Sequence, residues 1–125
     1  MSTTLQLATK KERKLEAAGI PLPSLITRAG HKAALRFAEF FTVNIRNRNT
    51  REAYGRAAAA FLNWCEERGL TELHQVQPIH VAAYIEQMQE NFSKPTVKQH
   101  LATIRMMLDW LVTGQVIPTK AARRT

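Results

Sequence analysis

Two short segments of the sequence gather basic side chains with few acids between them. Residues 46–56 contain Arg46, Arg48, Arg51 and Arg56, with Glu52 as their one acid. Residues 91–105 contain no acid and carry Lys94, Lys98 and Arg105. Ammonium and guanidinium groups bind phosphate oxygens, and some of them also reach base edges. The two segments therefore predict contacts to a nucleic acid.

Helical spacing places the basic side chains of the second segment on one face of a helix. Lys94, Lys98 and Arg105 fall at i, i+4 and i+11, which is one face of an α-helix. The apolar stripe of the same segment lies away from this face, so that it can pack in a core while the basic face stays free. Each basic segment also begins a predicted helix, whose unpaired amides and positive dipole end attract phosphate.

Nine side chains are the candidates for DNA contact. Thr96, Lys98 and Gln99 are predicted to reach bases in the major groove, because Gln can pair with adenine and Lys with guanine. The predicted phosphate contacts of the same helix are Lys94 and Arg105. The candidates on the earlier helix are Arg48, Thr50 and Arg51, at its start, and Arg56, one to two turns further on.

No set of residues predicts catalysis, a metal site or a cofactor. His100 has no acid near it and lies beside the predicted core residue Leu101, so a partly buried structural role is favoured over phosphate or base contact. Tyr54 and Tyr84 fall in apolar helical patterns. With one cysteine, Cys65, and four histidines, a structural zinc site is not expected. A nucleophile, a base and an orienting group do not occur together, so we expect no enzyme activity and no small-molecule substrate.

Length and composition bound the class of protein. The 125 residues fit one domain, and 45% hydrophobic residues suffice for one core, which excludes a disordered tail. A net charge of +8 favours nucleic acid as the partner over an anionic membrane surface. No apolar run reaches the roughly 18–20 residues that span a bilayer, and the polar N-terminus does not resemble a secretory signal. The lone cysteine fits a reducing cytoplasm.

Hydrophobic periodicity predicts an all-α fold, a compact bundle of four main helices with no sheet. The first runs from Thr27 or Gly30 to Asn44. The second follows the N-cap Asn47 and ends before Gly69. The third starts at Pro78 and continues to Met88. The fourth follows the N-cap Ser93 and stops at Gly114.

These elements predict three parts of the chain. Residues 27–117 form the helical domain. Residues 1–26 form a basic N-terminal extension, in which two prolines make Ile20–Pro23 a linker. Residues 118–125 form a basic linker.

The segment from Arg36 to Ala122 resembles the N-terminal core-binding (SAM-like) domain of tyrosine recombinases, the phage integrase family. The second predicted helix carries N-x-x-T-x-x-x-Y from Asn47 to Tyr54, followed by F-L-x-W and a glycine. The stretch Ser93 to Leu111, SKPTVKQHLATIRMMLDWL, resembles the helix that enters the major groove in this family.

The resemblance implies a function. In this family the domain grips duplex DNA at the core recombination site and contacts neighbouring protomers, while a separate domain cuts the DNA. The catalytic His-x-x-Arg pair does not occur in these residues, so the chain is expected to be non-catalytic by itself and 118–125 to lead toward a catalytic domain. The family also implies a bacterial or phage origin. In place of the family's usual Asn-Pro-Ala, the sequence reads Ile117-Pro118-Thr119, which leaves the linker geometry open.

Two other functions stay open on sequence grounds. A helical protein-interaction domain would use its positive face to bind an acidic partner. A DNA-binding regulator outside the recombinases would need a dimer and a helix-turn-helix pair.

Overall fold

The computed structural model describes residues 22–114. In this range it contains helices and no strand: α3 (Ser24–Arg28), α4 (His31–Asn44), α5 (Arg48–Glu67), the 3-10 helix η1 (Leu73–Gln75), α6 (Pro78–Met88) and α7 (Lys94–Thr113). The helices α4 to α7 are the four main helices of the sequence prediction, so the all-α fold is confirmed. The predicted linker 118–125 and most of the predicted extension 1–26 lie outside the described residues. No helix of residues 22–114 is long and apolar enough to cross a bilayer.

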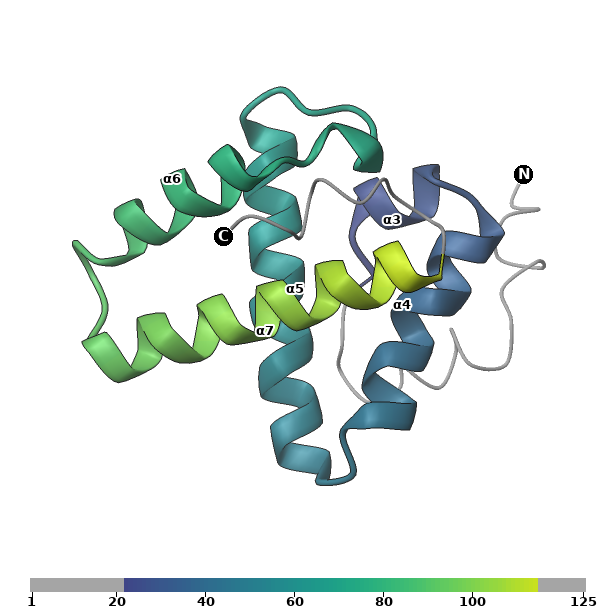
Figure 1. The fold of residues 1–125 in the computed structure, drawn as a ribbon, viewed down its shortest axis with the longest axis horizontal. Coiled ribbons are helices and arrows are strands. Elements are labelled where there is room, and N and C mark those ends of the chain that lie inside the picture. The colour runs from purple at the N-terminus through teal and green to yellow at the C-terminus, as the bar shows by residue number, and fades with distance from the viewer. Residues whose placement is uncertain (1–21, 115–125) are drawn as a thin grey trace.

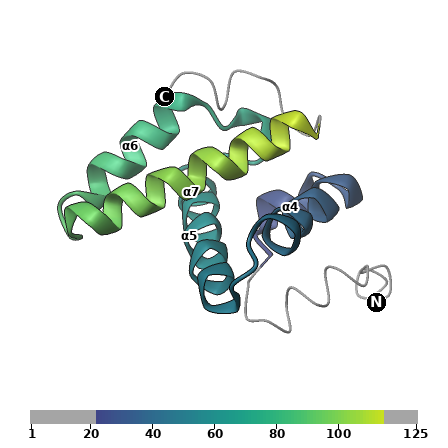
Figure 2. The ribbon, with the colours of Figure 1, turned by 60° about the horizontal axis from the view of Figure 1, so that its bottom comes forward.

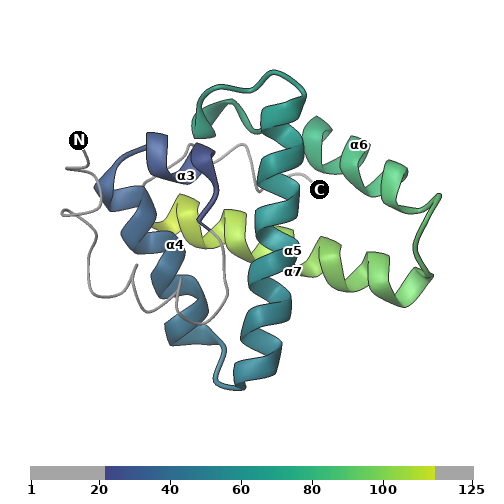
Figure 3. The ribbon, with the colours of Figure 1, turned by 180° about the vertical axis from the view of Figure 1, so that it is seen from behind.

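The helix α5 is the centre of the arrangement. α7 crosses α5 near the middle of both helices, with α4 on one side of α5 and α6 on the other (Figure 1). The views in Figures 2 and 3 show the same order from other directions. α7 packs against α4, α5 and α6, so one helix closes the core over the other three.

Large apolar side chains from three helices meet beneath α7. Phe37 and Phe41 of α4, Phe61 of α5 and Ile104 of α7 are fully buried. The Phe37 and Phe41 rings pack edge to face, with centroids 5.0 Å apart. Burial of each such side chain contributes about 1.5–3 kcal/mol, so these residues are the main source of stability.

The predicted ends of the second and fourth helices are confirmed. The Asn47 Oδ1 accepts a hydrogen bond from the Thr50 amide at 3.0 Å, and the Ser93 hydroxyl oxygen accepts one from the Thr96 amide at 3.4 Å. Gly69 has φ +102°, and the Leu70 amide beyond it donates to the Cys65 carbonyl at 3.2 Å. This is the bond pattern of a helix that ends through a left-handed residue, a conformation that favours glycine.

The packed core begins before residue 27, where the sequence prediction started the helical domain. The five-residue helix α3 buries Leu25 and Ile26 completely. The Pro23 carbonyl accepts from the Ile26 and Thr27 amides at 3.0 and 3.1 Å. A helix can start directly after Pro23 because the proline carbonyl remains a hydrogen-bond acceptor.

Candidate nucleic-acid interface

The first turns of α5 and α7 carry basic side chains and no acidic ones. Each first turn has one amide capped by a side chain, which leaves further amides that point out of the helix end. Lys94 and Lys98 on α7 are exposed, and the Arg48 side chain on α5 is 76% exposed. Both helix ends therefore combine a positive dipole end with exposed cations, which is the arrangement that attracts phosphate.

Arg48 and Arg56 share one carboxylate. Each guanidinium lies 3.9 Å from a Glu52 oxygen, at i and i+4 spacing along α5. Ion pairs this exposed contribute well under about 1 kcal/mol. Arg48 therefore loses little when it exchanges the Glu52 carboxylate for a phosphate.

Arg56 lies on the side of α5 that Arg48 and Glu52 share, and this side is turned away from Thr50. The core residue Ala58 is two positions further on, and two helical positions turn by about 200° around the axis. Arg56 thus faces away from the core and from α7, which covers that core. A DNA contact by Arg56 would have to come from this side of α5, and it stays a prediction.

The Arg51 guanidinium donates its hydrogen bonds to backbone carbonyls within the protein. Its Nε donates to the carbonyls of Phe41 and Ile45, both at 3.1 Å, and its Nη2 donates to Ile45 at 2.8 Å and Arg46 at 3.4 Å. These carbonyls belong to the end of α4 and the turn into α5, where a helix leaves acceptors without partners. Arg51 is therefore a structural link between the two helices, and its predicted role as a DNA contact stays a prediction.

Lys98 and Gln99 occupy opposite edges of the exposed face of α7. Consecutive helical residues are about 100° apart, and the exposed Ala102 lies between these two edges. Leu101 and Arg105 line a groove with α6, and Lys98 shares a hollow with Phe92, so the basic edge is the one beside α6. Lys94, at i−4 from Lys98, belongs to this edge as well.

The edge of α7 that carries Gln99 faces away from α6. Trp110, eleven residues after Gln99 and on the same edge, donates its Nε1 hydrogen bond to the Arg36 carbonyl of α4 at 2.8 Å. Met106 is on this edge too and is 46% exposed. Met106 is not among the predicted contact residues, although its position outside the apolar stripe marks it as a surface residue.

Thr50 points to the same region as Gln99. Phe61 of α5 contacts Tyr84 of α6, with ring centroids 5.3 Å apart, which fixes the α6-facing side of α5. Thr50 is eleven residues before Phe61 and so lies on this side, at the other end of α5 beyond α6. Figures 1 and 3 show the N-terminal halves of α5 and α7 diverging from their crossing with no described helix between them. We call this region the open angle.

Thr96 uses part of its hydrogen-bonding capacity at the N-terminus of its own helix, α7. Its hydroxyl oxygen accepts a hydrogen bond from the Ser93 hydroxyl at 3.0 Å, and its amide is the one that Ser93 caps. The hydroxyl can still donate one hydrogen bond. The structure thus brings Thr50, Thr96 and Gln99 to the open angle, and keeps Lys94, Lys98 and Arg105 along the opposite edge of α7.

His100 is held against Phe92 beneath the first turns of α7. The two rings stack with centroids 6.4 Å apart, and the His100 Nδ1 is buried with no hydrogen-bond partner among the described residues. Burial lowers the pKa of His100 below its ordinary value of 6.5. These contacts agree with the structural role that the sequence favoured.

Protonation of His100 should destabilise the fold. Because the folded-state pKa is lowered, the stabilising contribution is complete above pH 6.5 and is lost as the pH falls toward the folded-state value. We expect the unfolding free energy of the wild type to fall more steeply between pH 7 and pH 5 than that of His100→Gln, measured by urea denaturation. His74→Gln, at an exposed site, serves as the control and should follow the wild type. Parallel curves for all three proteins would contradict a buried neutral imidazole.

The described residues offer no group of three His, Cys, Asp or Glu side chains that could hold a metal ion. Cys65 is fully buried, and burial raises the pKa of its thiol to about 12. Burial, and secondarily Cys65, raises the pKa of Tyr84 above 10.0. Both side chains are therefore protonated at neutral pH, as packing residues are.

The comparisons with known proteins agree with this geometry. Residues 36–115 match the family model described as the phage integrase, N-terminal SAM-like domain. The matched range begins within α4 and includes all of α5, α6 and α7, and it confirms the resemblance drawn from the sequence. The searches of curated proteins and of solved structures returned no match.

Proposed function

Since the chain belongs to the family of the phage integrase N-terminal SAM-like domain, we propose that it binds duplex DNA as the core-binding domain of a site-specific tyrosine recombinase. The observation that carries this proposal is the pair of basic helix N-termini, α5 and α7, on either side of the open angle. The chain would bind without catalysing strand exchange, which belongs to the catalytic domain of such recombinases. Contacts between protomers would assemble the complex.

The dimensions of α7 suit a major groove. A helix with its side chains is about 10–12 Å across, and the groove is about 12 Å wide. With the exposed face of α7 inserted, the edge with Lys94, Lys98 and Arg105 faces one phosphate backbone. The first turn of α5 then faces the other backbone, with Thr50 on the side of the open angle and the exposed Arg48 on the opposite side of the same turn. Gln99 and the short Ala102 meet the bases.

Each part of this surface has a different task. The cations and the helix ends supply affinity without sequence information, whereas Gln99 reads a base edge, for which adenine is the preferred partner. Met106, on the Gln99 edge, can contact a thymine methyl group. A single module of this kind buries only about 600–1,000 Å², so binding by the isolated chain should be weak.

Salt dependence tests the proposal. If Arg48, Lys94, Lys98 and Arg105 each neutralise a phosphate, log K should fall with log salt at a slope of about −3.6. The affinity for a 30-base-pair duplex of mixed sequence would then drop roughly 150-fold between 50 and 200 mM salt, measured by fluorescence anisotropy. Lys32→Ala, an exposed cation on α4, should leave the slope unchanged. A wild-type slope shallower than about −1 would contradict DNA binding by this surface.

A further inference from the structure

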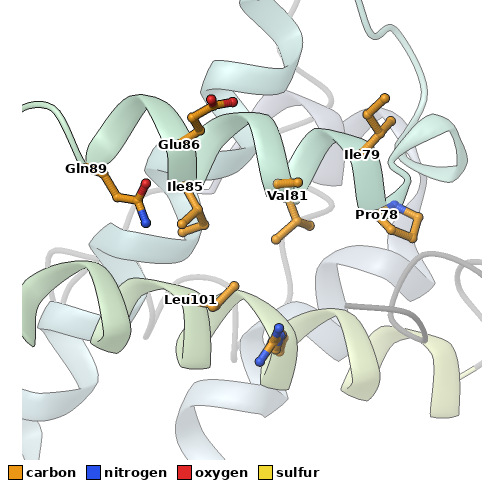
Figure 4. Close-up of a pocket in the computed structure, with 9 residues that line it drawn as sticks. Pro78, Ile79, Val81, Ile85, Glu86, Gln89 and Leu101 are labelled. Carbon is orange, nitrogen blue, oxygen red and sulfur yellow. The ribbon is translucent and has the colours of Figure 1, made fainter. Parts of the chain in front are cut away.

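A second surface lies between α6 and α7 and has a different chemistry from the DNA surface. Its floor is apolar, made by Val81 and Ile85 of α6 and Leu101 of α7, which point toward one another across the space between the helices (Figure 4). The groove encloses about 500 Å³. Ile79, which is 71% exposed, stands at its rim. Ile79 extends the apolar floor outward to the surface, and contiguous exposed apolar surface is typical of interaction sites.

The rim of the groove is charged unequally. Arg105 lies on the α7 side, and Glu86 lies on the α6 side. A neighbouring hollow of about 480 Å³ shares Gln89 with the groove and adds Lys94 and Lys98 to the same basic side. The α7 rim therefore presents three cations in a row, against one lining carboxylate on the other rim.

The apolar floor and the basic rim together indicate which kind of molecule could bind in the groove. A second copy of the chain would bring another net charge of +8 to a basic rim, and both ends of the chain outside the described residues are basic in sequence. A nucleic acid would have to place phosphates against an apolar floor and the Glu86 carboxylate. An apolar segment that carries acids along one edge satisfies both the floor and the basic rim.

We propose that the α6/α7 groove docks an acidic amphipathic helix of a partner protein. The eleven residues of α6 span about 16 Å, or three helical turns. A docked helix of that length would place anchors at i, i+3 or i+4, and i+7 over Ile79, Val81 and Leu101, with carboxylates beside Arg105 and Lys98. The groove shares its basic rim with the proposed DNA surface, so the partner helix and DNA would compete for Lys98 and Arg105. Only the partner helix would also use the apolar floor.

The partner chemistry can be determined without knowing the partner. A phage-displayed library of random 16-residue helical peptides would be selected on the full chain, and the selected peptides measured by fluorescence anisotropy. We expect enriched sequences with apolar residues at helical spacing and a net negative charge. Ile79→Ser should weaken their binding about tenfold, and Arg105→Glu by at least as much. The matched controls are Val43→Ser, at another exposed apolar residue, and Lys32→Glu, and both should change binding less than about twofold.

Several results would overturn the proposal. Selection of neutral or basic peptides, or of none, would exclude an acidic partner, and binding insensitive to Ile79→Ser would exclude the groove. Sedimentation that shows Ile79-dependent self-association of the chain would assign the groove to a second copy. A loss of duplex affinity in Ile79→Ser would assign it to DNA. If duplex binding shows a salt slope shallower than about −1 while the selected peptides still bind, the proposed DNA function is rejected and this inference stays in place.

Discussion

Arg51→Ala is expected to lower the free energy of unfolding by about 2 kcal/mol, although Arg51 stands in a segment that reads as a DNA-binding cluster. The Arg51 guanidinium donates to carbonyls of Phe41, Ile45 and Arg46. Hydrogen bonds from a charged donor contribute more than neutral ones, and their loss leaves the acceptors at the end of α4 without a protein partner. Urea denaturation followed by circular dichroism measures the change.

Arg48→Ala is the matched control for this result. Arg48 is three residues away, its side chain is 76% exposed and its pairing with Glu52 is long, at 3.9 Å. Its removal should change the unfolding free energy by less than about 0.5 kcal/mol. In DNA binding, Arg48→Ala should have the larger effect of the two substitutions. It should make the salt slope shallower by about 0.9, whereas folded Arg51→Ala should keep the wild-type slope. If Arg51→Ala changes the slope and leaves stability intact, the structural assignment of Arg51 is wrong.

The contrast between Arg48 and Arg51 shows what the sequence could predict. Helix caps at Asn47 and Ser93 follow from local residue types, and the structure has them. The acceptors of Arg51 lie up to ten residues away, at the end of another helix, and only the turn between α4 and α5 brings them near. A local pattern therefore identifies the basic cluster but not which of its members is free to bind DNA.

The same limit applies to the shape of the candidate interface. Periodicity correctly predicted the long helices, because their apolar stripes repeat over many turns. The helix α3 is five residues long and has no side-chain cap, so only its burial against α4 and α5 reveals it. The crossing of α5 and α7 brings Thr50 and Gln99 to one open angle, and a crossing depends on packing between distant residues.

Gln99→Ala and Lys98→Ala should have separable effects on DNA binding, because the two side chains lie on opposite edges of α7. Gln99 can bond a base edge through two hydrogen bonds, so its loss should lower the preference for a cognate duplex over random DNA by about 10- to 100-fold. In the proposed arrangement Lys98 contacts a phosphate, so its loss should lower binding to both duplexes alike. Its loss should also make the salt slope shallower by about 0.9. The cognate duplex would be one that the wild-type chain selects from a randomised pool.

Asn63→Ala provides the control, since Asn63 is an exposed amide on α5. Asn63 is seven residues, or about two turns, beyond Arg56 and so lies on the face of α5 that is turned away from α7. Its loss should leave both the preference and the slope at wild-type values. Equal losses on cognate and random DNA for Gln99→Ala would mean that this edge meets the backbone instead of the bases. The open angle would then hold a phosphate strand, and sequence reading would have to come from the face between Lys98 and Ala102 or from the shape of the DNA.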